Sequence, residues 1–152
     1  MEYRKTTDKD LDLLMEIRLE MLRKVNGLAD DYVFSDELTE HSRRYFLNGD
    51  QTTVIASENG VVAACASISY IEIMPTFSHP TGRRAHLMNV YTKEEYRRRG
   101  IARKLMEMLT EDAREKGASE ISLDATEQGR PLYEALGFRS SEECMVMTLP
   151  KK

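Results

Sequence analysis

The chain alternates between stretches in which apolar residues recur with a helical period and stretches rich in β-branched residues. In the first part, apolar side chains recur every three or four positions, which predicts a helix that starts at Thr7 or Asp8 and ends near Gly27. A second helix is expected over residues 35–47, which open with a Ser-Asp-Glu-Leu start. Residues 2–6 fit a short first strand ahead of both helices.

The middle of the chain has the pattern of a sheet. Residues 52–57 and 61–73 are rich in β-branched side chains, and the sequence ENG between them is a hairpin signal. Residues 74–84 contain two prolines and a glycine, so we expect a loop there. Residues 86–92 (HLMNVYT) are mostly apolar on both faces, which indicates a strand inside the sheet.

The last third returns to alternation between helix and strand. Residues 101–116 place their apolar side chains on one helical face and end at Gly117. Residues 120–125 fit a strand, and residues 131–136 fit a short helix with proline in its first turn. Residues 144–149 are expected to form a final strand.

This order of elements predicts the fold class. A strand–helix–strand unit implies a parallel pair of strands, while the earlier hairpin implies antiparallel pairing. We therefore expect an α/β protein of the mixed α+β type, built on a single mixed sheet with helices on both faces. A chain of 152 residues fits one domain, residues 1–152.

Composition and charge exclude several classes of function. The net charge of −4 argues against a general binder of nucleic acid, which is usually basic. No apolar run approaches the roughly 18 residues that span a bilayer, and the first residues lack the apolar core of a signal peptide. Cys65 and Cys144 are isolated and have no metal-ligand spacing. We expect a cytoplasmic protein with no metal, nucleic-acid or membrane partner.

The stretch EYRRRGIARKL, residues 95–105, concentrates positive charge just before a helix. The first amides of a helix have no partners inside it, and the helix dipole adds partial positive charge there. Gly100 permits a close backbone approach, so a pyrophosphate could lie over the amides of residues 98–103. The alternative is an ordinary turn with solvated arginines. The glycines of a P-loop or of a dinucleotide fingerprint are absent.

The segment VYTKEEYRRRGIARKL resembles the cofactor-binding motif of the GNAT superfamily of N-acetyltransferases, in which Gln or Arg, two residues, Gly, one residue and Gly or Ala follow one another. Arg97, Gly100 and Ala102 fill this motif in register. The later piece GRPLYEALGF is similar to a family segment in which a tyrosine precedes a Gly-Phe pair. The match is strong over residues 87–138.

The resemblance implies a sheet of six to seven strands, mostly antiparallel, with a splayed parallel pair and four helices. It also implies acetyl-coenzyme A as the acetyl donor and no metal. The family's donor-binding positions correspond here to Val90, Tyr91, Thr92, Arg97, Arg98, Arg99, Gly100, Ile101, Ala102, Arg103, Thr126 and Tyr133. The chain departs from the family in having Thr126 where Asn is frequent and Gly129 where Ala is common.

The chemistry requires an amine to lose a proton and a departing thiolate to gain one. Tyr133 is the candidate acid, because it lies about 100° from the apolar stripe of its helix; the alternative is a tyrosine that packs beside Phe138. His86 is the candidate base, although it lies about 13 Å along the strand from Val90, whose amide would polarise the acetyl carbonyl. A histidine held beside neighbouring arginines, or a water chain without a dedicated base, are the alternatives.

The acceptor is the least constrained part of the hypothesis. We expect direct transfer to a primary amine, because neither cysteine lies in the matched motif. A small-molecule amine is favoured over a protein or peptide amine, and a homodimer is left open. A donor-binding sensor without turnover is the main alternative, and the retained Tyr133 argues against it. Nucleic-acid binding by the arginine stretch lacks an aromatic stacking platform.

Overall fold

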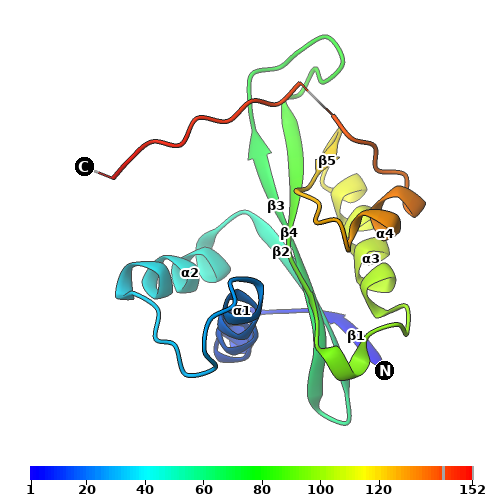
Figure 1. Ribbon diagram of the computed structural model, residues 1–152. Helices are drawn as coiled ribbons and strands as arrows, with labels where there is room; N and C mark the ends of the chain where they lie inside the picture. The colour runs from blue at the N-terminus through cyan, green and yellow to red at the C-terminus, as the bar shows by residue number, and fades with distance from the viewer. Residues whose placement is uncertain (142, 152) are drawn as a thin grey trace.

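The computed structural model describes residues 1–141 and 143–151, and its elements follow the predicted order up to the fourth helix (Figure 1). Two short 3-10 turns accompany the strands and helices, Asp8–Asp10 before α1 and Glu94–Tyr96 after β4. The remaining elements are β1 Glu2–Lys5, α1 Leu11–Val25, α2 Asp36–Asn48, β2 Gln51–Glu58, β3 Val61–Glu72, β4 Arg83–Thr92, α3 Ile101–Glu115, β5 Ile121–Ser122 and α4 Arg130–Ala135.

The strands form a mixed sheet in the order β1-β2-β3-β4-β5, in which only β4 and β5 run parallel. The predicted class, with four α-helices distributed over both faces, is confirmed. The strand number is lower than the expected six to seven: the sheet of the described residues has five strands. Residues 144–149 form no strand, and only Ile121–Ser122 of the expected strand 120–125 is paired. β-prone residues become a strand only where a neighbouring backbone supplies hydrogen bonds.

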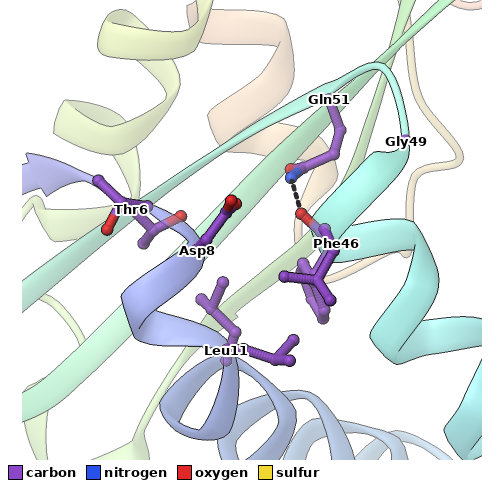
Figure 2. Close-up of a pocket in the computed structure, with 9 residues that line it drawn as sticks. Thr6, Asp8, Leu11, Phe46, Gly49 and Gln51 are labelled. Atoms are coloured by element: carbon purple, nitrogen blue, oxygen red, sulfur yellow. Dashed lines mark hydrogen bonds between the residues drawn. The ribbon is translucent and has the colours of Figure 1, made fainter.

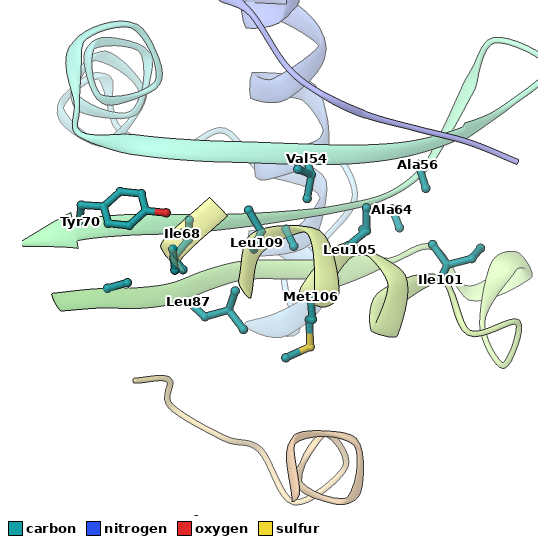
Figure 3. Close-up of a cluster of buried hydrophobic side chains, with 13 residues drawn as sticks. Val54, Ala56, Ala64, Ile68, Tyr70, Leu87, Ile101, Leu105, Met106 and Leu109 are labelled. Carbon is teal, nitrogen blue, oxygen red and sulfur yellow. The ribbon is translucent and has the colours of Figure 1, made fainter. Parts of the chain in front are cut away.

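Two apolar layers hold the sheet between helices, and Figure 3 shows the layer on the side of α3. One helix, α3, directs Ile101, Leu105 and Leu109 at one face, whereas α1 covers the other face with its own buried cluster. Between them β3 is buried on both sides, and its run of small residues at positions 63–66 lets both helices approach closely. This packing fixes the position of α3 relative to β4.

Both hairpins of the antiparallel part connect strands as the sequence suggested, but β4 contains a feature that the sequence reasoning missed. Between Ser67 and Cys65 of β3, the register with β4 shifts by one residue, so Asn89 and Val90 lie opposite a single residue. Asn89 is in the left-handed conformation, φ 57°, which asparagine adopts more readily than most residues. The result is a β-bulge in the strand that leads to the arginine stretch.

Within the described residues, no helix combines the length and the apolar character that a membrane crossing requires.

Candidate functional site

The loop between β4 and α3 bends through two left-handed residues. Arg98 has φ 65° and Gly100 has φ 75°, and Gly100 is the N-cap of α3. A Cβ placed on Gly100 would meet no atom within 4 Å. The glycine is therefore required by its backbone conformation, and the space before it is open to a ligand.

The amides at the start of α3 have no protein partner. Among the described residues, no hydrogen bond is donated by the backbone amides of residues 98–103, and no side chain caps the helix. The first paired amide is that of Lys104, which donates to the carbonyl of Gly100 at 3.2 Å. The first turn also contains no acidic residue. A run of exposed, unpaired donors at the positive end of a helix dipole is suited to bind an anion.

Three of the arginine side chains in this stretch already contact other groups of the protein. Arg97 Nε donates to the carbonyl of Thr92 at 3.0 Å, which ties the loop back to β4. The guanidinium of Arg99 lies over the Tyr96 ring, 5.3 Å from its centroid. Arg103 forms an ion pair with Glu107, one turn later in α3. Within the described residues, the Arg98 side chain makes no hydrogen bond or ion pair. The backbone amides and the Arg98 side chain are thus available to an anion.

A gap opens between β4 and β5 directly beside this loop. The two strands pair only at Ala85 with Ile121 and at His86 with Ser122. Beyond His86, residues 87–92 of β4 have no partner on that side among the described residues. Alternate N–H and C=O groups of a strand point to each side, so this edge presents unpaired donors and acceptors. The predicted splayed pair is therefore present, and Val90, Tyr91 and Thr92 lie along it.

Polar side chains from distant parts of the chain hold the bulge in β4. Arg18 on α1 donates to Asn89 Oδ1 at 3.1 Å, and Asn89 Nδ2 donates to Ser67 Oγ at 3.1 Å. Burial lowers the pKa of the Arg18 guanidinium. Tyr91 is anchored in the same way, since its hydroxyl donates to Glu20 Oε2 of α1 at 2.7 Å. The helix α1 therefore fixes the backbone of β4 along the part that is not paired with β5.

Tyr133 packs as the structural alternative suggested, yet its hydroxyl stays available. Its ring meets that of Phe138 edge to face, with centroids 6.1 Å apart. Within the described part of the chain the hydroxyl has no hydrogen-bond partner, and burial raises its pKa. Val90 and Tyr133 both pack against the core cluster that α3 fills. A ring held in place with a free, protonated hydroxyl is suited to donate a proton.

The Thr126 hydroxyl is less available to a ligand than the Tyr133 hydroxyl. Its hydroxyl accepts a hydrogen bond from the amide of Gly129 at 3.1 Å, and its carbonyl accepts from Arg130 at 3.0 Å. A Cβ on Gly129 would lie 2.9 Å from the Tyr133 ring. Thr126 therefore fixes the turn that leads into α4, and Gly129 leaves room for Tyr133.

His86 lies where β4 and β5 separate, and its partners come from β5 and the residues just after it rather than from the neighbouring arginines. Its Nδ1 is 2.7 Å from Ser122 Oγ, and its Nε2 is 3.6 Å from the carboxylate of Asp124. Ser122 Oγ is also 3.4 Å from the carbonyl of Ala85. If Ser122 donates to that carbonyl, it accepts the proton of His86 Nδ1, and Nε2 then carries the free lone pair.

A hollow elsewhere in the protein and the Cys65 thiol are not part of the site at the gap between β4 and β5. A hollow of about 190 Å³ lies where α1, α2 and β2 begin or end, and Gln51 donates there to the carbonyl of Phe46 at 3.2 Å (Figure 2). Ligand pockets for drug-sized molecules measure about 300–1,000 Å³, so this hollow is too small for a nucleotide-sized ligand. Cys65 is fully buried, and burial raises the pKa of its thiol to about 12.

Some of these groups were not found from the sequence. Asn89 stood inside an apolar strand, where an asparagine is a signal for a left-handed bulge residue. Arg18, Ser122 and Asp124 gave no local signal, because their partners lie far away along the chain. The described residues contain no group of His, Cys, Asp and Glu that could hold a metal ion.

The fold is shared with solved acetyltransferase structures. A predicted acetyltransferase from Clostridium acetobutylicum, solved with acetyl-CoA, superposes with a TM-score of 0.85 at 33% identity, over 97% of this chain and 95% of that one. A GCN5-related N-acetyltransferase from Ralstonia eutropha gives a TM-score of 0.79 at 28% identity, over 99% and 97% of the two chains.

Sequence relatives carry more specific names. Glucosamine 6-phosphate N-acetyltransferase of Trypanosoma brucei brucei is 35% identical over 77 residues, which are 51% of this chain and 52% of that protein. Thialysine N-epsilon-acetyltransferase of Bos taurus is 38% identical over 72 residues, 44% and 42% of the two chains. The matched part thus spans about half the length of these relatives, or less.

The family model covers far more of the chain. The model of the acetyltransferase (GNAT) family matches residues 13–138, which include the bulge, the arginine loop, the gap between β4 and β5, and Tyr133. The match confirms the resemblance read from the sequence. The chain belongs to the acetyltransferase (GNAT) family.

Proposed function

We propose that the protein is an N-acetyltransferase that moves the acetyl group of acetyl-coenzyme A directly onto a primary amine of a small molecule. The observation that carries the proposal is the run of unpartnered amides at residues 98–103, next to the open edge of β4. A pyrophosphate needs the first feature, and an amide-bearing arm needs the second. The family match and the neighbour solved with acetyl-CoA support the same donor.

The residues present fit this donor. The amides of residues 98–103 and the Arg98 side chain would hold the pyrophosphate, with the open space before Gly100 admitting it. The edge formed by Val90, Tyr91 and Thr92 would bind the arm as an added strand, and the Thr126 hydroxyl can still donate one hydrogen bond. When bound, acetyl-coenzyme A supplies a thioester whose carbonyl carbon is open to attack by an amine.

The bulge gives Val90 a distinct role. A bulge releases backbone groups from the regular ladder, and Val90 lies in the bulge at the open edge. We assign its amide to polarise the acetyl carbonyl and to stabilise the charge that develops on the oxygen. Arg18 and Asn89 act as positioning residues here, since their hydrogen bond to each other holds the bulge.

Tyr133 is assigned as the acid that protonates the departing sulfur. Its hydroxyl has no protein partner among the described residues, and its raised pKa keeps the proton on Oη at neutral pH. Direct transfer is favoured over an acyl-enzyme, because Cys65 is buried with a pKa of about 12 and Cys144 lies in the exposed tail.

His86 is assigned as the base that takes a proton from the amine at Nε2. Ser122 Oγ lies 2.7 Å from its Nδ1, and the Asp124 carboxylate lies 3.6 Å from Nε2. His86 shares the face of the sheet that α1 and α2 cover, together with Ser69, which lies opposite it on β3. The amine is therefore expected to enter from the side of α1 and α2.

The size class of the acceptor rests on the named relatives. One is named for glucosamine 6-phosphate and the other for the ε-nitrogen of thialysine, and both compounds are small molecules that carry an amino group. This favours a small-molecule amine over a peptide as the first class to test.

The decisive experiment has two stages. First, saturating acetyl-coenzyme A should raise the melting temperature of the purified protein, because a ligand of the native state stabilises it. Second, thiol release should be measured over amino sugars, diamines, lysine analogues and lysine-containing peptides, with acetylation of the amine checked by mass spectrometry. Stabilisation without turnover on any amine would favour a sensor, turnover on peptides alone would favour protein acetylation, and no stabilisation would remove the basis of the proposal.

A further inference from the structure

An arginine on α1 faces the sheet without a carboxylate partner. Arg18 is half-buried, and within the described part of the chain its guanidinium forms no ion pair. Two other covered arginines, Arg83 and Arg84, each form an ion pair with a carboxylate. Burial lowers the pKa of the Arg18 guanidinium, because the charge loses solvation. A desolvated charge that lacks an opposite charge is costly, so an anion that binds there would gain much.

Two nitrogens of Arg18 are available for such an anion. Its Nη1 donates to Asn89 Oδ1 at 3.1 Å and lies 4.0 Å from Met21 Sδ. Its Nε and Nη2 have no hydrogen-bond partner among the residues that the structure describes, and both are reached by solvent. These two nitrogens form one edge of the guanidinium, whose paired N–H groups match two oxygens of a carboxylate or a phosphate.

A chain of hydrogen bonds across the sheet holds Arg18 in this orientation. Thr53 Oγ1 donates to Gln51 Oε1 at 2.6 Å, and Ser67 Oγ lies 2.7 Å from Thr53 Oγ1. Ser67 therefore donates to Thr53 and accepts from Asn89 Nδ2 at 3.1 Å. The amide oxygen of Asn89 is then turned toward Arg18, which receives its contact at Nη1 and keeps its other edge free.

Arg18 lies beside an open part of the sheet surface that also contains the candidate base. The helices α1 and α2 stand on one side of the sheet (Figure 1). His86 and Met88 point to this side, because the residues that alternate with them pack against α3. Met88 is nevertheless 47% exposed, so neither helix covers the surface there. His86 and Asn89, the partner of Arg18, are three residues apart, about 10 Å along the strand.

We propose that Arg18 binds an acidic group of the acceptor, so that the substrate is a small amine that also carries a carboxylate or a phosphate. The inference rests on the N-acetyltransferase function proposed above and narrows its acceptor class. With the acid on Arg18, the amino group lies over Met88, between His86 and the Val90 amide. A second ammonium group would instead meet the guanidinium, so like charge disfavours diamines and polyamines.

Pairs of amines test this preference, each pair being an acid and the same amine with a neutral group in place of the acid. The pairs are β-alanine and β-alaninamide, lysine and lysinamide, 2-aminoethyl phosphate and ethanolamine, and glucosamine 6-phosphate and glucosamine. In at least one pair the acid should have a kcat/KM about 10- to 150-fold higher, the range of a hydrogen bond to a charged group. The responding pair distinguishes a carboxylate from a phosphate.

The variant Arg18→Gln removes the charge and keeps an N–H that can reach Asn89 Oδ1. It should raise KM for the acid far more than for its neutral counterpart, so that the ratio of kcat/KM between the two falls to near one. Arg43→Gln removes an exposed cation of α2, whose guanidinium lies 3.5 Å from Asp12, and should leave the ratio unchanged. An equal loss for both members of a pair in Arg18→Gln would show that Arg18 only holds the bulge, and the binding role would be wrong.

A binding measurement without turnover separates this inference from the proposed function. Coenzyme A is first bound at saturation, and inorganic phosphate or acetate is then added while thermal unfolding is followed. At least one of these anions should raise the melting temperature more in the wild type than in Arg18→Gln, whereas the general effect of salt is common to both proteins. No response to coenzyme A would overturn both proposals. A response to coenzyme A with equal anion effects in the two proteins, and no preference for the acid in any pair, would overturn the role of Arg18 alone.

Discussion

Adding a single methyl group at Gly100 tests the anion site with a control that the fold itself supplies. Gly100 and Gly117 stand at opposite ends of α3, with φ values of 75° and 77°. A Cβ on either would meet no atom within 4 Å. Both alanine variants therefore suffer the same backbone strain in the same free space. They differ only in that Gly100 lies among the unpaired amides of residues 98–103.

The magnitudes follow from these two facts. A left-handed conformation costs an L-residue about 1–2 kcal/mol, which corresponds to a fall of about 2–8 °C in melting temperature for a chain of this size. Gly100→Ala and Gly117→Ala should share this loss. Hydrogen bonds to charged groups contribute about 1.5–3 kcal/mol, so displacing one amide–phosphate bond at Gly100 should weaken coenzyme A binding by about 10- to 150-fold. Gly100→Val should abolish binding.

Calorimetric titration of coenzyme A and thermal unfolding without ligand give the two readouts on the same samples. The expected pattern is equal destabilisation with loss of affinity only for Gly100→Ala. Equal loss of affinity in both variants would show that the stability of the helix controls binding. Wild-type affinity in Gly100→Ala would mean that the phosphates bind elsewhere, and the anion site at α3 would be wrong.

Three further changes test the assigned roles. Tyr133→Phe should lower turnover by about tenfold or more and spare donor binding, whereas Gly129→Ala, whose Cβ would lie 2.9 Å from that ring, should lower turnover less; unchanged rates in both would return Tyr133 to a packing role. His86→Ala should lower turnover and spare donor binding, and a variant that keeps the wild-type rate would exclude His86 as the base. Buried Asp112 loses solvation, but hydrogen bonds from Lys5 and others outweigh this and hold its pKa at about 2. The stability it contributes is present above its usual pKa and lost as pH falls from about 4 toward 2, so Asp112→Asn should lower urea stability by about 1.5–3 kcal/mol at pH 7 and much less near pH 2.

The sequence predicted the elements that form through local or repetitive patterns. The helical period defined α1 and α3, whose apolar faces fill the two core layers. The sequence ENG defined the hairpin, where Asn59 and Gly60 both adopt positive φ, as a two-residue turn requires. The loop before α3 was also predictable, because the free amides of a helix start depend on a few adjacent residues.

Strand ends were less predictable, because they depend on partners rather than on the strand's own residues. Residues 120–125 have strand character throughout, but β4 and β5 diverge after Ser122 and the ladder stops. Residues 144–149 have the same character and pair with no strand among the residues that the structure describes. The sequence thus contains the tendency to pair, while the arrangement of backbones decides where pairing occurs.

The parts of the site that escaped prediction depend on long-range contacts. The bulge at Asn89 is held by Arg18, 71 positions earlier, and His86 is held by Ser122, 36 positions later. The sequence alternative that placed His86 beside neighbouring arginines followed chain proximity. In the sheet, Ser122 of β5 lies beside His86, and its contact with Nδ1 orients the imidazole.

The two departures from the family pattern are explained by one packing unit in front of α4. Thr126 replaces the frequent asparagine, and its hydroxyl accepts the amide of Gly129, which fixes the turn into the helix. Gly129 replaces the common alanine, and the missing Cβ leaves the space that the Tyr133 ring fills. With alanine at 129, the ring would have to shift, and its contact with Phe138 would change with it. The substitutions at 126 and 129 therefore belong together, because each sets the position of the hydroxyl to which we assign the proton transfer.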